Sequence, residues 1–293
     1  ILKICTNKYF KEYGSKKLVN DTGSSKSFDE IDSIDISRDI KTNMLSETDE
    51  LIVLYHDSFV YKDHIMIKLN MYGDNLYSGR NKLYKMYFHE KLLISKKLFE
   101  ALEFLESCPI SIIHGDLKPE NILFKNNNLN CLDVVITDFG LSKISNTYLY
   151  LERNELLQSR YYRAPEIVFN IKYNISIDIW SVGCIIYEIF KKKPLIYCKE
   201  DGDILLYMYA ILGIPPKSYI DSSINILKNY NNYYPNKMYD YKKKIIEPNS
   251  LNNLLINDDE KLNQLFDLIK KCLIYDDTHR ITAKEAIELI DTF

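Results

Sequence analysis

Several features that would assign the chain to a particular class of protein are missing from its sequence. No uninterrupted apolar run reaches the roughly 18 residues of a membrane-spanning helix, and there is no signal-peptide pattern and no internal repeat. The six cysteines are dispersed, and no two lie close enough in the sequence to indicate a zinc site or a redox pair. Dispersed thiols in a chain of this length are typical of a reducing compartment.

A strong excess of one charge is missing as well. The 38 lysines and arginines nearly balance the 41 aspartates and glutamates, which leaves a formal net charge of −3. Binding of a polyanion needs a clustered positive face, which this balance does not favour. We therefore predict contact with neither nucleic acids nor membranes, and an intracellular location in the cytoplasm, the nucleus or both.

What is present is an ordinary globular composition, with 46% hydrophobic and 27% charged residues in a chain of 293. This length predicts one large domain or two small lobes. Apolar runs predict strands over 1–4, 51–55 and 64–69, with a helix over 28–45. After Gly73, apolar spacing predicts helices over 83–106, 176–190, 203–212, 260–273 and 282–290. We therefore expect an α+β fold with a strand-rich first part and a helical second part.

Three short motifs follow the first long helix of the second part in a fixed order. They are His-Gly-Asp-Leu-Lys-Pro-Glu-Asn at 114–121, Asp-Phe-Gly at 138–140 and Ser-Arg-Tyr-Tyr-Arg-Ala-Pro-Glu at 159–166. Two short apolar stretches, 122–124 and 134–136, separate the first two motifs and predict a pair of strands.

The residue types in these motifs match the needs of phosphoryl transfer. That reaction requires a base for the attacking hydroxyl, oxygen ligands for magnesium and a cation beside the phosphates. Asp116 is the candidate base, and Lys118 is the candidate charge beside the transferred phosphate. Asn121 and Asp138 are the candidate metal ligands, because magnesium prefers oxygen and is shared with substrate phosphates.

The three motifs, taken together, resemble the eukaryotic protein kinase family. The resemblance implies a bilobal kinase fold, with a small lobe over 1–70 and a large lobe over 71–293. It implies ATP and Mg²⁺ as cofactors and transfer of the γ-phosphate to serine or threonine hydroxyls of protein substrates. Autophosphorylation on tyrosine is left open.

The motifs also indicate a subfamily. Residues 111–121, 157–167 and 212–216 are similar to the homeodomain-interacting and dual-specificity tyrosine-regulated kinases of the CMGC group. These families carry a small residue before the catalytic aspartate, as Gly115 is here. An arginine at that position binds an activating phosphate in other kinases. Its absence implies an activation that does not depend on that contact.

The resemblance implies three structural pairings in the large lobe. Asp178 is expected to brace the backbone around His114. Arg280 is expected to pair with Glu166 as an architectural ion pair. Ser159 matches the hydroxyl that bonds the catalytic aspartate and lysine in serine/threonine-directed kinases.

The first part of the chain departs from the family pattern. Residues 1–4 resemble the strand whose lysine grips the α- and β-phosphates, which assigns that role to Lys3. The two strands and the glycine-rich loop that precede it in the family are absent, which indicates either a fragment or a degenerate lobe, and the missing initiator methionine favours a fragment. The usual glutamate partner of the lysine is also missing, so either Asp35 or Asp39 substitutes for it with a shorter reach or the pair is lost.

Counting from the strand at 64–69 locates the adenine-binding hinge. Leu69 stands at the gatekeeper position, followed by the hinge residues Asn70, Met71 and Tyr72. Backbone groups carry out recognition at a kinase hinge, so these side chains are weakly informative.

The activation segment departs from the pattern too. In the similar families, a tyrosine four residues before Arg160 is autophosphorylated and bound by two arginines, but Leu156 stands there. Two neighbouring guanidinium groups require an anion. We expect Arg160 and Arg163 to be held by Glu155 or Glu152, or otherwise by a phosphate on Tyr148 or Tyr150.

Two other classes of function compete with the enzyme. A non-catalytic kinase-like scaffold would bind partners through the large lobe, but such a protein is free to lose catalytic residues, and all four are present here. A small-molecule kinase is disfavoured by the segment 161–166, which resembles a peptide-holding segment.

Overall fold

Two units make up the chain, Ile1–Gly73 and Asp74–Phe293. The computed structural model describes residues 2–5, 50–61, 64–108, 111–128, 131–144, 148–151, 156–213, 215–222, 251 and 259–293. The helix expected over 28–45, with its candidates Asp35 and Asp39, lies outside the described residues. Glu152 and Glu155 lie outside them as well.

The first unit contains an antiparallel sheet in the order β1-β3-β2, with β1 at Leu2–Cys5, β2 at Tyr55–Tyr61 and β3 at His64–Leu69. The apolar strand β3 is central and pairs with both neighbours. The strand predicted over 51–55 is wrong, because the hairpin aligns Tyr61 with His64 and thereby pairs residues 55–61 instead. The polar residues at 56–58 hid this edge strand from a search for apolar runs.

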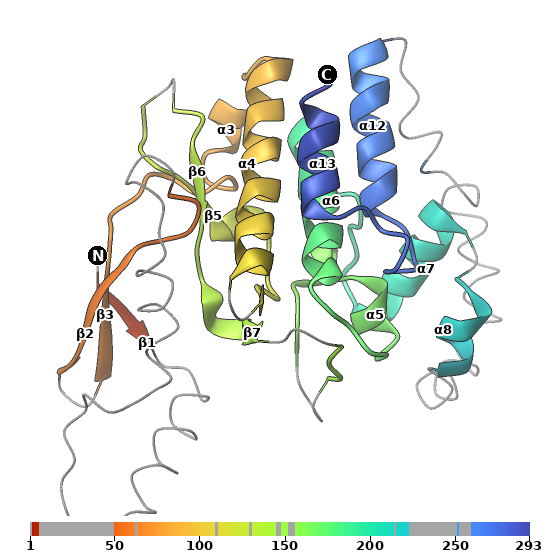
Figure 1. Ribbon diagram of the computed structural model, residues 1–293, viewed down its shortest axis with the longest axis horizontal. Coiled ribbons are helices and arrows are strands. Elements are labelled where there is room, and N and C mark those ends of the chain that lie inside the picture. The colour runs from red at the N-terminus through yellow and green to blue at the C-terminus, as the bar shows by residue number, and fades with distance from the viewer. Residues whose placement is uncertain are drawn as a thin grey trace, which may run out of the picture. The chain divides into compact units, whose positions relative to one another are not determined.

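The second unit is mainly helical, and four helices form its core (Figure 1). They are α4 (Phe88–Ser107), α6 (Ser176–Lys191), α12 (Glu260–Cys272) and α13 (Ala283–Ile290). Helix α4 packs against both α6 and α13, and α6 also packs against α12. Helix α6 is apolar on nearly all sides, which is why it is buried between its neighbours.

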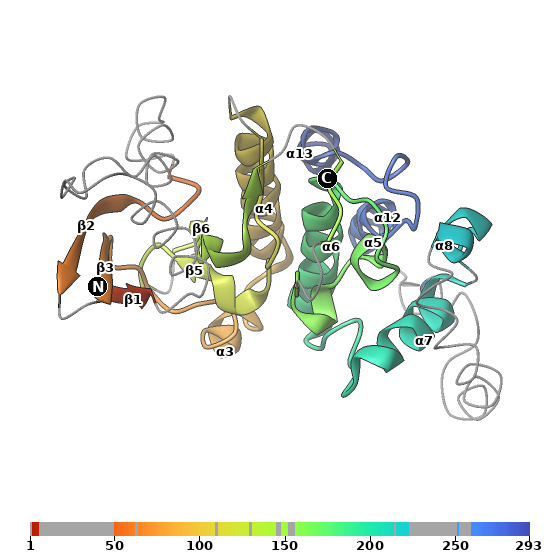
Figure 2. The same cartoon turned by 90° about the horizontal axis from the view of Figure 1, so that it is seen from below.

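The predicted helices at 176–190, 203–212, 260–273 and 282–290 are confirmed, with ends that differ by up to two residues. Helix α7 spans Asp201–Leu212, and the short helices α5 and α8 span Pro165–Val168 and Lys217–Ser222. Figure 2 shows α6 beside both α4 and α12 from a second direction. None of the helices in the described ranges is both long and apolar enough to cross a membrane.

The single helix predicted over 83–106 is wrong, because the structure divides it into α3 (Arg80–Leu83) and α4. Residues 84–86 form a tighter turn, in which Met86 donates its backbone N–H to the Leu83 carbonyl. Tyr87 is then extended, with φ −68° and ψ 166°. The Glu90 carboxylate accepts the Tyr87 backbone N–H at 2.6 Å and so begins α4 with a cap.

Two small antiparallel pairs carry the motifs. Strand β4 (Ile112–Ile113) pairs with β7 (Lys143–Ile144), and β5 (Ile122–Phe124) pairs with β6 (Val134–Ile136). The predicted pair at 122–124 and 134–136 is thus confirmed. These pairs hold residues 114–121 and 138–142 next to each other against α4 and α6.

Candidate active site

The first motif is a buried loop between β4 and β5. Its end, Pro119–Asn121, is a 3-10 turn with proline at the first position, where a missing N–H costs nothing. Both Asp116 and Asn121 are largely buried, whereas Lys118 between them is partly exposed. The Thr137 backbone N–H donates to the Asn121 carbonyl at 2.9 Å, which ties the end of this loop to the start of the second motif.

The carboxylate of Asp116 is the centre of a polar network. Lys118 Nζ donates to Asp116 Oδ2 at 2.7 Å, and Ser159 Oγ donates to Asp116 Oδ1 at 2.7 Å. Lys118 Nζ also lies 3.1 Å from Ser159 Oγ. The amide nitrogen of Asn121 donates to the Asp116 backbone carbonyl at 2.8 Å. The structure therefore brings together three of the predicted residues, and it confirms the expected bonds of Ser159.

His114 orients the backbone of this loop as a neutral imidazole. Its Nε2 lies 3.0 Å from the Thr137 carbonyl, and the Asp116 backbone N–H lies 3.2 Å from Nδ1. Nδ1 can accept that hydrogen bond only if the proton resides on Nε2. Complete burial lowers the pKa of His114 to about 4, which keeps the ring neutral near neutral pH.

Asp178 of α6 holds the same loop from the other side. Its two carboxylate oxygens accept the backbone N–H groups of His114 at 2.6 Å and Gly115 at 3.0 Å. Burial raises the pKa of Asp178 to about 7, while the two backbone donors act in the opposite direction. The predicted brace is confirmed.

Gly115 is required by the backbone itself. Its φ is +75°, and a Cβ placed there would lie 2.8 Å from the Leu157 side chain and 2.9 Å from the Leu141 carbonyl oxygen. An arginine at this position would therefore need both the loop and its neighbours to move. The packing of this loop therefore leaves no room for the arginine that binds an activating phosphate in other kinases.

The second motif follows β6 directly. Asp138 has φ 70° in the left-handed region, and the Phe139 ring packs 4.9 Å from the His114 ring, centroid to centroid. Asp138 contributes to the electrostatic environment of His114, as does Asp116. Ser142, just after the motif, donates its hydroxyl to the His114 carbonyl at 3.0 Å.

Sequence reasoning missed Gln158, which joins three segments. Its backbone N–H donates to the Gly115 carbonyl at 2.8 Å, and its side chain accepts the Ala164 N–H at 2.9 Å. The same side chain donates to the Ile177 carbonyl at 2.9 Å and to Ser181 Oγ at 2.8 Å. The residue is 3% exposed and has φ 59°. A lone glutamine carries no sequence signal for this role.

The two arginines of the third motif contact backbone carbonyls. Arg160 donates to the carbonyl of Lys199, and Arg163 donates to that of Gln158 at 3.0 Å. Asp277 and Asp276 raise the pKa of Tyr148 beyond the effect of burial. Lys172 Nζ lies 4.5 Å from the Tyr148 ring, but the carboxylates of Asp276 and Asp277 make this tyrosine a less favourable position for an activating phosphate.

The expected pair between Glu166 and Arg280 is confirmed. Arg280 Nη2 lies 2.7 Å from Glu166 Oε1, and both side chains are fully buried. The arginine also donates to the backbone carbonyls of Ser176 at 2.8 Å and Ile274 at 2.9 Å. Burial raises the pKa of Glu166, and Arg280 lowers it.

In the first unit, β1 carries Lys3 opposite Ile67, and the Lys3 side chain lies outside the described residues. The residues predicted as the hinge lie at and just after the end of β3. The hydroxyl of Tyr72 donates to Glu50 and accepts the Leu54 backbone N–H at 2.9 Å, whereas Met71 is 79% exposed. The predicted hinge comprises Leu69, Asn70, Met71 and Tyr72.

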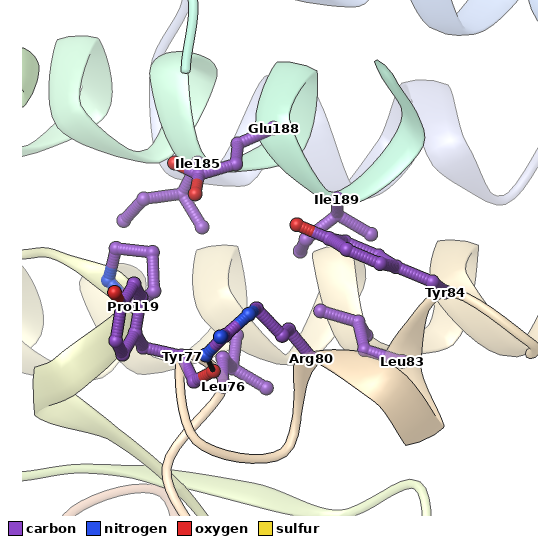
Figure 3. A pocket seen from close by; sticks show the side chains of 9 residues that line it. All are labelled: Leu76, Tyr77, Arg80, Leu83, Tyr84, Pro119, Ile185, Glu188 and Ile189. Atoms are coloured by element: carbon purple, nitrogen blue, oxygen red, sulfur yellow. Dashed lines mark hydrogen bonds between the residues drawn. The ribbon is translucent and has the colours of Figure 1, made fainter. Parts of the chain in front are cut away.

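A small pocket lies beside the 114–121 loop, between α3 and α6 (Figure 3). Arg80 and Tyr84 come from α3 and its end, and Glu188 comes from α6. Glu188 also accepts the Tyr162 hydroxyl at 2.7 Å. The lining comprises Leu76, Tyr77, Arg80, Leu83, Tyr84, Pro119, Ile185, Glu188 and Ile189.

The fold and this loop network define a protein kinase domain. The family model of the protein kinase domain matches residues 2–289, and the chain belongs to this family. A solved crystal structure of a kinase domain aligns with a TM-score of 0.71 at 23% identity, and covers 87% of this chain and 81% of that one. The predicted kinase fold is thereby confirmed.

Curated relatives confirm the subfamily resemblance. The chain is 30% identical over 260 residues to "Probable serine/threonine-protein kinase dyrk2" of Dictyostelium discoideum, which covers 85% of this chain. It is 34% identical over 169 residues, 57% of this chain, to dual specificity tyrosine-phosphorylation-regulated kinase 3 of Rattus norvegicus. The matches span only 27% and 28% of the lengths of these two relatives.

Proposed function

We propose that the chain catalyses transfer of the ATP γ-phosphate to serine or threonine hydroxyls of protein substrates. The observation that carries this proposal is the Asp116 network. One buried carboxylate is oriented by Lys118 and by Ser159, each at 2.7 Å, on a loop braced by Asp178. This is the arrangement that a general base needs, because a base must be held within hydrogen-bond reach of the substrate hydroxyl.

In the proposed reaction, the Asp116 carboxylate accepts the proton of the substrate hydroxyl as its oxygen forms a bond to the γ-phosphorus. The bond between that phosphorus and the bridging oxygen breaks, and ADP leaves with the electron pair. Lys118 sits beside the carboxylate, where its charge neutralises the negative charge of the transferred group. Ser159 holds the carboxylate in place.

The residues present fit a magnesium ion carried by the nucleotide. Asn121 uses its amide nitrogen on the Asp116 backbone, which presents the amide oxygen as a ligand, and Asp138 supplies a carboxylate. Hard oxygen ligands of this kind, shared with phosphate oxygens, suit Mg²⁺. The ion would neutralise charge on the phosphates. No group of three or more His, Cys, Asp or Glu placed to hold a metal occurs among the described residues.

The two units correspond in this proposal to the small lobe, about 1–70, and the large lobe, about 71–293. We assign Lys3 to the nucleotide phosphates on the strength of its place on β1 beside the central strand. Leu69, Asn70, Met71 and Tyr72 are proposed as the adenine hinge. The bonds of Tyr72 to Glu50 and Leu54 support a fixed backbone at this point.

The scaffold alternative is not favoured by the site. A protein that only bound partners would have no need for a largely buried aspartate that is bonded to a lysine and a serine at 2.7 Å. Such a set costs desolvation that a scaffold would not recover. The family membership and the network therefore both support an enzyme.

Replacing Asp138 by asparagine is expected to remove the magnesium dependence of nucleotide binding or to weaken it strongly. The substitution keeps the shape of the side chain but removes the negative charge that holds the ion. Nucleotide titrations with magnesium and with a chelator, on the parent chain and the variant, measure the effect. Asp133→Asn, at an exposed position before β6, is the matched control. Equally tight ATP binding by the parent chain with chelator present would instead support the scaffold.

We expect the activation segment to work without tyrosine phosphorylation. Gln158 already ties the segment to the catalytic loop and to α6, and Arg163 is held by the Gln158 carbonyl. A phosphate on Tyr148 would lie among carboxylates. Protein made in bacteria and treated with phosphatase should therefore phosphorylate a serine peptide at the same rate as protein from a eukaryotic host.

Tyr148→Phe and Tyr150→Phe provide the check on this expectation. Both variants should retain the parent rate, because neither hydroxyl is required for the contacts of Gln158. If phosphatase treatment and Tyr150→Phe both abolish activity, a phosphate on that tyrosine is the switch, and the phosphate-independent interpretation is wrong.

A further inference from the structure

Four lysines gather where the carboxy end of α6 meets the amino end of α4. Phe88 and Phe190 join the two helix ends through an edge-to-face ring contact at 5.5 Å. The three residues that follow Phe190 are lysines, and α4 adds a fourth lysine about one turn beyond its start. We call this cluster the lysine patch, and it comprises Lys91, Lys191, Lys192 and Lys193.

Aromatic rings hold three of these lysines in place. The Nζ of Lys91 lies 5.7 Å from the ring of Phe190, that of Lys191 lies 4.5 Å from Phe266, and that of Lys192 lies 5.8 Å from Tyr84. A ring below the ammonium group restricts a side chain that otherwise has many rotamers. A ligand that binds these charges therefore loses less entropy than at freely moving lysines.

The charges of the patch are not balanced by acids. None of the four lysines forms an ion pair with a residue in the described part of the chain. Burial lowers the pKa of Lys91, and the charge of Lys192 lowers it further. The pKa of Lys191 is lowered by burial and then by Lys193. The carboxy end of a helix attracts a cation, but its partial charge of about half a unit cannot balance four.

We propose that the lysine patch is a docking surface for an acidic segment of a partner protein. Lys191, Lys192 and Lys193 are partly or fully exposed, whereas Lys91 is only 8% exposed behind them. The half-buried rings of Tyr84 and Phe190 lie among these charges, and Tyr87, which stacks on His89, is 73% exposed. A peptide of acidic residues with an apolar side chain complements both features. The patch involves none of the residues assigned to phosphoryl transfer, so the proposal stands apart from the proposed reaction.

The size and charge of the surroundings favour a short acidic segment over an extended polyanion. Nucleic acids and anionic membranes bind positive faces that extend over many phosphates or headgroups. The lysine patch lies at two helix ends in a chain of net charge −3, and this net charge repels a long polyanion beyond the patch. A short segment experiences the local attraction without the wider repulsion.

The test measures binding of a short fluorescent peptide, built on a run of glutamates and one phenylalanine, to the full chain without nucleotide. Its glutamine counterpart is the peptide control. Neutralising the patch should weaken binding about tenfold at low ionic strength, because three charge pairs are lost. Added salt should weaken the parent interaction and have little effect on the variant. The variant is Lys191→Gln, Lys192→Gln and Lys193→Gln together.

A matched variant removes the same net charge elsewhere, at exposed lysines of α8, α12 and α13: Lys217→Gln, Lys261→Gln and Lys284→Gln. This control should bind the acidic peptide within about twofold of the parent chain, and thermal unfolding should show both variants folded. Equal losses in the two variants would overturn the proposal in favour of general charge attraction. Equal binding of the glutamine peptide, or tighter binding of an oligonucleotide or phosphatidylserine vesicles at the patch, would overturn it too.

Discussion

Replacing Asp116 by alanine should lower kcat for peptide phosphorylation by about 100- to 10,000-fold while the KM for ATP changes little. The reason lies in what the carboxylate contacts. Its short bonds are to Lys118 and Ser159, each at 2.7 Å, and Asn121 lies farther from it, at 3.4 Å. A group that acts on the attacking hydroxyl affects the rate of the chemical step, whereas nucleotide affinity depends on other contacts.

Two further variants sharpen this experiment. Asp116→Asn preserves the shape and can still accept the Ser159 hydrogen bond, but it is a far weaker base, so its loss of kcat should approach that of alanine. Asp133→Ala, at an exposed site in the same unit, should leave both constants unchanged. If Asp116→Asn retains the parent kcat, or if ATP affinity falls in parallel with kcat, Asp116 is not the base.

The residues of the proposed chemistry were predictable because they lie in short contiguous motifs. The residue types and spacing within 114–121 are those expected for phosphoryl transfer, and the pair β5–β6 brings Asp138 back to the same loop. Asp178 and Arg280 were found by resemblance alone, since nothing local marks an aspartate at a helix start or an arginine in a polar turn as buried. Their burial comes from packing between segments that are distant in sequence.

The two errors in the predicted secondary structure have physical causes that apolar patterns do not reveal. The predicted helix 83–106 has continuous apolar spacing, but the extended Tyr87 and its Glu90 cap divide it. A pattern of apolar spacing does not reveal a single residue with an extended backbone. Strand β2 is set by the hairpin register with β3, which overrides the apolar run at 51–55.

The roles of two further residues could not be predicted because they depend on backbone conformation. Gln158 and Asp138 both have positive φ, which few residues other than glycine adopt. Gln158 maintains this conformation because its side chain is bonded on both sides, to Ala164 and to Ser181. Such a network exists only after the segments have packed, so the sequence alone gives no indication of it.

Replacing Arg280 by methionine should lower the free energy of unfolding by about 3–5 kcal/mol at neutral pH. The substitution leaves the Glu166 carboxylate fully buried without its partner, and it removes the bonds of Arg280 to Ser176 and Ile274. Urea unfolding followed by circular dichroism measures the loss. Lys96→Met is the matched control, because the Lys96–Asp291 pair is partly exposed and should contribute under about 1 kcal/mol.

The loss should also depend on pH in a definite direction. Burial already raises the pKa of Glu166, and without Arg280 nothing of opposite charge lowers it. A carboxyl whose pKa is higher in the folded than in the unfolded state binds protons on folding, so acid favours the fold. The deficit of Arg280→Met should therefore shrink as the pH falls from about 7 to about 5.

Adding Glu166→Gln to Arg280→Met should recover part of the stability at pH near 7 and remove the pH dependence. If Arg280→Met lowers the free energy of unfolding no more than Lys96→Met does, or if its deficit grows in acid, the buried pair does not stabilise the contact between Glu166 and Arg280.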